Sequence, residues 1–221
     1  MTNSARYHRI IAIDGPAASG KSSVARELAA KIGFVYVNSG AMYRAVTWHV
    51  LERGIDPRNR SAVEDVADEL QFECDLDGNE SRIMIGGVDP TPHLRDARVN
   101  DGVSLVSSVP RVREVLVKKM RDYVLEHDVV MEGRDIGSVV FPKTPFKFYI
   151  DASPEIRSQR RAAQGQTDRI TARDHADSSR SASPLTVAAE AEVIDTSELS
   201  IAAVVVTIID RLRAKGFEAA A

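Results

Sequence analysis

The chain is poor in the features that mark secreted and membrane proteins. Cys74 is the single cysteine among 221 residues, so no intramolecular disulfide can form, which suits the cytoplasm. The N-terminal stretch MTNSARYHRI lacks the apolar core of a signal peptide. The most apolar stretch, IAAVVVTII, is too short to cross a bilayer. We therefore expect a soluble, cytoplasmic protein.

An excess of charge of either sign is also missing. Asp and Glu number 32 against 29 Lys and Arg, which gives a net charge of −3. Such a chain has no general electrostatic attraction to nucleic acid or to a membrane surface, so neither is expected as a partner. Internal repeats and Ser/Thr/Pro-rich linkers are absent as well. The length fits one α/β domain, alone or with an insertion, and we expect a monomer.

What the sequence does contain, close to its start, is a phosphate-binding loop. The stretch GPAASGKSS matches the pattern G-x-x-x-x-G-K-[ST]. Its glycines let successive backbone N–H groups point at phosphate oxygens, and the next helix turns its positive end to the same anion. A lysine there adds charge at the terminal phosphates, and a serine hydroxyl can hold magnesium. We therefore predict a nucleotide site formed by Gly15, Pro16, Ala17, Ala18, Ser19, Gly20, Lys21, Ser22 and Ser23.

Apolar runs alternate with helical patterns along most of the chain, which favours an α/β fold with a parallel sheet wrapped by helices. Strands are predicted at 9–14, 34–38, 129–132, 146–151 and 192–195. Helices are predicted at 21–31, 41–53, 62–70, 112–126, 154–163 and 200–215, and Ser153 followed by Pro154 is a helix-start signal.

The segment from 70 to 109 breaks this rhythm. The stretch QFECDLDGNESRIMIGG alternates around an Asp-Gly-Asn turn, which predicts an antiparallel hairpin, and a loop and a helix follow. We expect a phosphate-loop core at 1–69 and 110–221, with 70–109 inserted as a subdomain for a second substrate. That last role is an analogy with other folds of this kind.

Two classes of nucleotide protein compete at this point: a switch GTPase or ATPase motor, and a kinase for a small molecule. A GTPase should show N-K-x-D, which is absent, and the D-x-x-G match at 75–78 falls in the hairpin turn. A kinase needs a second site and cations around the transferring group. Arg134 follows a predicted core strand, where α/β folds place ligands. Glu132, which ends that strand, either orders magnesium through water or caps a loop.

Arginines are concentrated further along the chain. They are Arg157, Arg160, Arg161, Arg169, Arg173 and Arg180. A solvated helix face is one explanation. The other, which we favour, is a flap that closes over a triphosphate, because arginine offers a two-pronged fork for phosphate oxygens and lysines are few here.

With these residues in view, the chain resembles the bacterial cytidylate kinase family. The segments that carry the resemblance are IDGPAASGKSSVA, NSGAMYRAV, SSVPRVRE, EGRDIGSVVFP, RDHADSSRSASPL and VIDTS, in that order. The resemblance implies a P-loop kinase that moves the γ-phosphoryl group of ATP to CMP or dCMP with Mg²⁺. The alternatives are a nucleoside-monophosphate kinase of other base preference, and a nucleotide-binding protein that uses closure as a switch.

The resemblance also implies a role for each matching residue. ATP would contact the loop from Gly15 to Ser23, with Arg157 and Arg161 as further cations. CMP would contact Ser39, Tyr43, Arg44, Ser104, Arg113, Arg134, Asp135, Arg173, Asp177 and Arg180. Lys21, Arg134 and Arg180 would act on the transferring group. Magnesium would be held by Ser22 and, through water, by Glu132.

The chain departs from the family's usual pattern in three places. Asn38 stands where the family usually has Asp, so this chain lacks a charge that would organise either magnesium or a neighbouring arginine. The loop ends in GKSS where many relatives carry GKGT, and both serines still offer hydroxyls. The arginine-rich lid, at about 157–175, is shorter than usual by roughly three helical turns.

Overall fold

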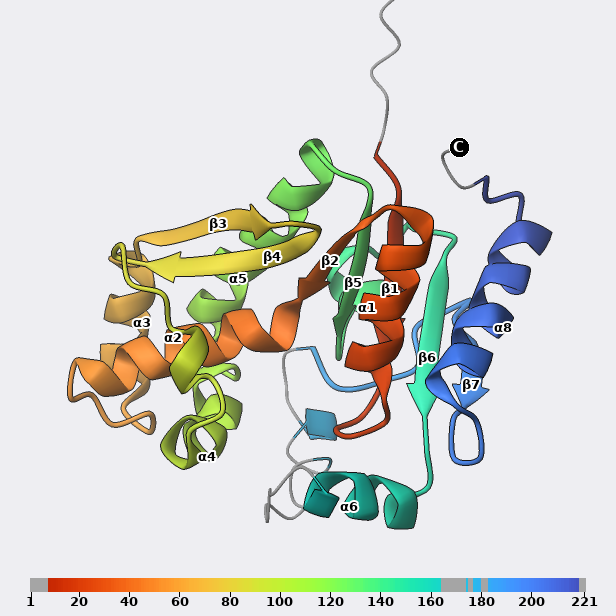
Figure 1. Cartoon of the computed structure of the whole chain (residues 1–221). Coiled ribbons are helices and arrows are strands. Elements are labelled where there is room, and N and C mark those ends of the chain that lie inside the picture. Colours follow the sequence, from red (N-terminus) through yellow and green to blue (C-terminus); the bar gives the residue numbers. More distant parts are fainter. Residues whose placement is uncertain (1–7, 164–173, 175–176, 180–182, 219–221) are drawn as a thin grey trace, which may run out of the picture.

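A single mostly parallel sheet organises the protein (Figure 1). The computed structural model describes residues 8–163, 174, 177–179 and 183–218. Within them, the strand order is β3-β4-β2-β5-β1-β6-β7, and β2, β5, β1, β6 and β7 pair in parallel. The strands are β1 (Ile10–Asp14), β2 (Val35–Asn38), β3 (Phe72–Asp77), β4 (Glu80–Ile85), β5 (Val129–Gly133), β6 (Lys147–Asp151) and β7 (Glu192–Asp195). The predicted fold class is confirmed.

Helices connect the strands, as predicted. They are α1 (Lys21–Ile32), α2 (Ser39–Glu52), α3 (Arg60–Asp68), α4 (Ala97–Val106), α5 (Pro110–Asp122), α6 (Pro154–Ala163) and α8 (Ile201–Ala214). Shorter turns are η1 (Thr91–His93), η2 (Tyr123–Leu125) and the π-helical turn η3 (Ile136–Val140). None of the helices described here has the length and apolar character needed to cross a membrane.

Local capping explains where two helices differ from prediction. Helix α2 begins at Ser39, two residues early, because the Asn38 side chain caps it by accepting a 3.0 Å hydrogen bond from the Ala41 N–H. Helix α5 begins at Pro110, whose ring suits the first helical turn, and ends at Asp122, where η2 follows. Helix α6 has its predicted bounds, and Ser153 caps it by accepting from the Ile156 N–H.

The two faces of the sheet bury separate hydrophobic clusters, because successive side chains of a strand point to opposite faces. Ile11 and Ile13 of β1 belong to the cluster covered by α1 and α8. Ala12, between them, belongs to the cluster covered by α2 and α5. With both faces covered, the parallel strands present their carboxyl ends together along one edge, where ligands bind in such folds.

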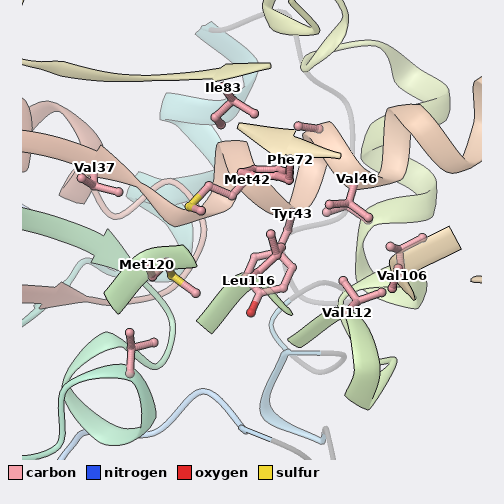
Figure 2. Close-up of a cluster of buried hydrophobic side chains, with 14 of the residues drawn as sticks. Val37, Met42, Tyr43, Val46, Phe72, Ile83, Val106, Val112, Leu116 and Met120 are labelled. Atoms are coloured by element: carbon pink, nitrogen blue, oxygen red, sulfur yellow. The ribbon is translucent and has the colours of Figure 1, made fainter. Parts of the chain in front are cut away.

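The predicted hairpin is confirmed and extends this sheet. Strands β3 and β4 are antiparallel, and Gly78 takes a left-handed φ of 61° in the turn between them. Tyr36 and Glu80 form the register pair that joins the hairpin to β2. Figure 2 shows Phe72 and Ile83 of the hairpin in the same cluster as side chains of α2 and α5. The division into a core and an insertion at 70–109 stays a prediction.

Candidate active site

A cleft of about 490 Å³ opens at the carboxyl ends of β2 and β5. Its walls come from the loop between β1 and α1, the start of α2, helix α4, the segment after β5, helix α6 and the start of α8. Segments far apart in the chain meet here because the parallel strands all deliver their following loops to this edge.

The phosphate loop has the backbone geometry that its sequence requires. Gly15 has a φ of 153°, and a Cβ added there would lie 2.1 Å from the backbone oxygen of Ile150, so a side chain has no room above β6. Gly20, with a φ of 93°, stands at the N-terminus of α1. The Lys21 ammonium donates a 3.0 Å hydrogen bond to the Pro16 carbonyl, so this lysine folds back over its own loop.

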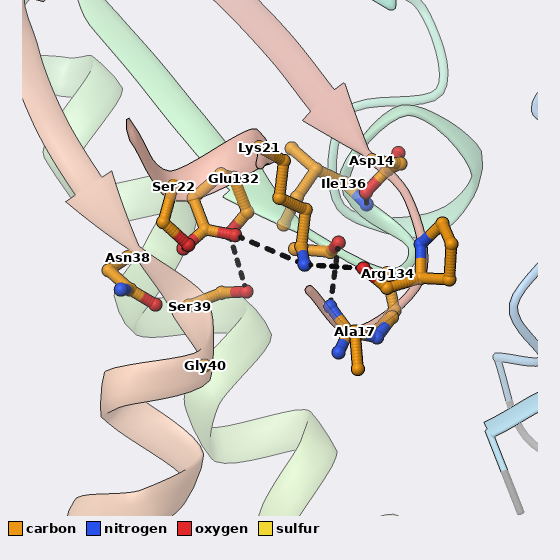
Figure 3. Close-up of polar contacts among 12 residues, drawn as sticks. Asp14, Ala17, Lys21, Ser22, Asn38, Ser39, Gly40, Glu132, Arg134 and Ile136 are labelled. Atoms are coloured by element: carbon orange, nitrogen blue, oxygen red, sulfur yellow. Dashed lines mark hydrogen bonds and ion pairs between the residues drawn. The ribbon is translucent and has the colours of Figure 1, made fainter. Parts of the chain in front are cut away.

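Glu132 points from the end of β5 toward this loop (Figure 3). The Ser22 hydroxyl donates a 2.7 Å hydrogen bond to its Oε1, and the Lys21 Nζ lies 3.9 Å from its Oε2. The Tyr36 hydroxyl also donates to Oε1, at 3.4 Å. The Asn38 amide in turn donates to the Tyr36 hydroxyl oxygen at 3.2 Å. The carboxylate is buried, so these polar side chains hold it in place at the edge of the cleft.

The donor set at this point fits magnesium that arrives with a nucleotide. Ser22 and Glu132 offer oxygen ligands, which Mg²⁺ prefers. Among the described residues, no group of three or more His, Cys, Asp or Glu side chains could hold a metal by itself. Mg²⁺ in kinase sites needs no such cage, because water and substrate phosphates fill most of its coordination sphere.

A second group of cations lines the same cleft. Arg134 follows β5, and its Nε donates a 2.9 Å hydrogen bond to the buried Asp177. Arg44, on α2, donates to the Gly40 carbonyl at 3.1 Å. Both arginines line the cleft, as predicted from the sequence. Arg173, predicted to contact the ribose, and Arg180, predicted to reach the transferring group, lie outside the described residues.

Deeper in the cleft, two charged residues form a buried pair. The Arg113 Nη2 donates to the Asp135 Oδ2, and its Nη1 donates to the Ser107 carbonyl at 3.2 Å. The guanidinium also lies 5.3 Å from the centre of the Tyr43 ring, a cation–π distance. Ser39 and Ser104 also line the cleft. The pair offers one cationic donor and one anionic acceptor side by side.

The α6 arginines divide into two groups. Arg161 lines the cleft, as expected of a nucleotide contact, and so does its neighbour Arg160. Arg157 is not among the lining residues: its guanidinium donates to the carbonyls of Ala152 and Ala17 and pairs with Asp174 at 2.5 Å. Arg157 therefore supports the phosphate loop through the loop's backbone.

Sequence reasoning missed one wall of the cleft. Thr196 and Leu199, between β7 and α8, and Ile201, the first residue of α8, line the cleft together with Arg160. The Arg160 guanidinium donates to the Thr196 carbonyl at 2.7 Å and to the Ser19 carbonyl at 3.2 Å. The sequence could have indicated this wall, because these residues follow a predicted parallel strand and therefore lie at the same edge of the sheet as the phosphate loop.

The fold and the loop together define a P-loop nucleotide-binding protein. The family model described as cytidylate kinase matches residues 11–214. The cytidylate kinase of Pelotomaculum thermopropionicum is 42% identical over 92% of this chain and 96% of its own length, and that of Mycobacterium leprae is 41% identical over 92% and 95%. The chain belongs to the cytidylate kinase family.

Solved structures show a more distant likeness. A shikimate kinase from Acinetobacter baumannii in complex with shikimate aligns over 96% of both chains, with a TM-score of 0.49 and 12% identity. A likeness at this level has no bearing on which substrate this chain uses.

Proposed function

We propose that this protein transfers the γ-phosphoryl group of ATP to CMP or dCMP, releasing ADP and CDP or dCDP. One observation carries the proposal: a single cleft holds both a phosphate-binding loop and a second set of arginines beside a buried Arg–Asp pair. Membership of the cytidylate kinase family supports this choice of substrates.

ATP occupies the phosphate-loop side of the cleft. The backbone N–H groups of the loop and the start of α1 bind its phosphates, and Lys21 and Arg161 add positive charge. Ser22, with Glu132 acting through water, would hold Mg²⁺, which neutralises charge on the β- and γ-phosphate oxygens when bound. In this arrangement the Glu132 carboxylate orients both the Ser22 hydroxyl and the Lys21 ammonium.

CMP occupies the side of the cleft formed by α2, α4, α5 and the segment after β5. Arg44 and Arg134 bind its phosphate, because guanidinium groups match phosphate oxygens in pairs. Asp135 accepts from the cytosine amino group, and Arg113 donates to the ring nitrogen and carbonyl beside it. Uracil would place a carbonyl oxygen against the Asp135 carboxylate, and the two would repel each other.

The remaining CMP contacts follow from position in the cleft. Tyr43 packs beside Arg113, and Ser39 and Ser104 line the pocket next to the base. Asp177 is oriented by Arg134 and contacts the ribose. Arg173, for the ribose, and Arg180, for the transferring phosphoryl group, complete the set that we propose from the family resemblance.

The reaction is a direct, in-line phosphoryl transfer. The CMP phosphate is already largely ionised near neutral pH, so no general base is needed. The loose transition state spreads negative charge over the equatorial oxygens, and Lys21, Arg134 and Arg180 stabilise that charge. Closure of the segments around the cleft excludes water, which would otherwise accept the phosphoryl group.

A coupled assay for ADP tests the proposal. ADP should form rapidly with CMP or dCMP and far more slowly with UMP, AMP or GMP. Equal rates with AMP would mean a nucleoside-monophosphate kinase of other base preference. ATP binding with no acceptor-dependent ADP would mean a nucleotide-binding protein that transfers nothing.

A further inference from the structure

A buried carboxylate at the end of β1 joins the two halves of the cleft. Asp14 is 3% exposed, and its two oxygens accept from the backbone N–H groups of Ile136, at 2.8 Å, and Gly137, at 2.7 Å. Asp14 directly precedes Gly15, the first residue of the phosphate loop. Ile136 directly follows Asp135 (Figure 3 shows Asp14 beside Ile136).

These hydrogen bonds fix the start of the turn that carries the second group of site residues. The N–H groups at the start of a helical turn have no partner within the turn itself. In η3, the later N–H groups of Val139 and Val140 donate to the Asp135 carbonyl, while those of Ile136 and Gly137 donate to Asp14. The turn is thus capped by a side chain from a strand more than 120 positions earlier in the chain.

The residues that line the cleft do not include Asp14, so its effect on the reaction would pass through the residues that it holds. Its neighbours in the sheet are Gly133 on β5 and Tyr149 on β6, so it is held from both sides. Because the Asp14 backbone is paired on both sides, its side chain fixes the position of η3 relative to the sheet. A movement of η3 relative to β1 would change the distance between the phosphate loop and Arg134.

We infer that Asp14 is a positioning residue, which sets the alignment of the acceptor phosphate with the γ-phosphate of ATP by tying the Arg134–Asp135 segment to the phosphate loop. The inference depends on the proposed function, since it concerns the alignment of its two substrates. A carboxylate is needed because both of its oxygens accept. An amide has one acceptor oxygen, and its NH₂ group would face a backbone N–H donor.

The expected signature is a loss of turnover without a matching loss of binding. Each nucleotide keeps its own contacts when Asp14 changes, but the reacting atoms lose their alignment, and a misplacement of about 1 Å can cost about a hundredfold in rate. Asp14→Asn should lower kcat by at least about tenfold, with KM values for ATP and CMP within about threefold of wild type.

A matched control separates positioning from stability. Asp128, just before β5, also accepts a backbone N–H, that of Arg9 at 2.6 Å, and lies at the other end of the strands. Asp128→Asn removes a comparable hydrogen-bonded carboxylate without touching the cleft. It should lower the melting temperature while kcat per folded molecule stays at the wild-type value.

The deciding experiment measures kcat, both KM values and the melting temperature for wild type, Asp14→Asn and Asp128→Asn. A fall in kcat confined to Asp14→Asn supports the inference. Equal kcat in all three overturns it, as does a KM change that accounts for the whole loss. A wild type that does not phosphorylate CMP would instead refute the proposed function.

A second variant covers the case in which Asp14→Asn does not fold. A Cβ at Gly137 would lie 3.3 Å from the Lys147 side chain, a tight contact, and 3.4 Å from the Asp14 Oδ2, so Gly137→Ala crowds the place where η3 meets Asp14 and removes no hydrogen-bonding group. It should lower kcat severalfold with little change in KM. An unchanged kcat in Gly137→Ala would overturn the inference on its own.

Discussion

The Ser22 hydroxyl donates a 2.7 Å hydrogen bond to the carboxylate of Glu132, which links the start of α1 to the end of β5. This contact joins the two oxygen donors proposed for magnesium. It also places Glu132 within 3.9 Å of the Lys21 ammonium, so the carboxylate, the hydroxyl and the cation form one group at the phosphate end of the cleft.

The first prediction concerns magnesium. Glu132→Gln keeps the size of the side chain and removes its charge, so the free Mg²⁺ concentration for half-maximal activity should rise by about tenfold, the order expected when a group that orients a metal's ligands is lost. Activity measured against free Mg²⁺ at saturating ATP tests this. Glu27→Gln, on helix α1, which also carries Ser22, is the control, because Glu27 pairs with Lys31. An unchanged Mg²⁺ requirement would remove Glu132 from the metal site.

The second prediction concerns the phosphate-loop lysine. Lys21→Ala removes a cation placed at the transferring phosphates and should lower kcat by about 10²- to 10³-fold, with the fold intact by circular dichroism. Lys31→Ala, at the C-terminal end of the same helix α1 and paired with Glu27, should retain activity. Near-normal turnover of Lys21→Ala would contradict the assignment of this loop.

The third prediction concerns base selection. Asp135→Asn replaces an acceptor with a side chain that can also donate to the uracil carbonyl, so the ratio of kcat/KM for CMP over UMP should fall by at least about tenfold. The substitution keeps a hydrogen-bond acceptor for Arg113, whose exposed fraction is 5%, but it removes the counter-charge of that buried guanidinium, so a lower melting temperature is expected as well. The two kcat/KM values are measured in the same coupled assay. A ratio equal to that of wild type would rule out direct reading of the base by Asp135.

The fourth prediction concerns pH and stability. Burial raises the pKa of Asp14 from 3.8 to about 6 and outweighs the two backbone hydrogen bonds, which lower it. Arg134 and Asp135 also act on it, and Lys147 and Tyr149 on β6 lie nearby. Because the folded state holds this proton to a higher pH than the unfolded chain, the stabilisation is complete below pH 3.8 and is lost as the pH rises through 6.

Comparison with a neutral side chain isolates this effect. The free energy of unfolding of wild type minus that of Asp14→Asn should fall by up to about 3 kcal/mol between pH 4 and pH 7. Urea unfolding across that range measures it. Asp128→Asn provides a control of opposite sign: burial raises the pKa of Asp128, but the hydrogen bonds and charge of Arg9 lower it overall. The stabilisation from the Asp128 carboxylate is therefore complete above pH 3.8 and is lost only at lower pH. A stability difference between wild type and Asp14→Asn that does not change from pH 4 to pH 7 would contradict the prediction.

How much of this structure the sequence could predict depends on how local each signal is. The Asp-Gly-Asn turn gave the hairpin, and Ser153 with Pro154 gave the start of α6, because turn and cap chemistry act between near neighbours. The π-helical turn η3 was not predicted. Its first two N–H groups donate to Asp14, which is distant in the sequence, and the residues around Ile136 do not indicate this partner.

The candidate site shows the same division. The phosphate loop is a contiguous motif, so its residues could be named in advance. Arg157 and Arg160 are three positions apart on α6, and the sequence alone could not show that the Arg160 guanidinium lines the cleft while the Arg157 guanidinium contacts the Ala17 carbonyl and Asp174. Thr196 and Leu199 enter the cleft only because β7 pairs with β6, a contact between distant segments.

A crystal structure with CMP and a non-hydrolysable ATP analogue tests the central claim most directly. The account predicts the CMP phosphate at Arg44 and Arg134, with an oxygen about 3–3.5 Å from the γ-phosphorus held over Lys21. CMP bound away from these arginines, or with its phosphate turned from the phosphate loop, would contradict it.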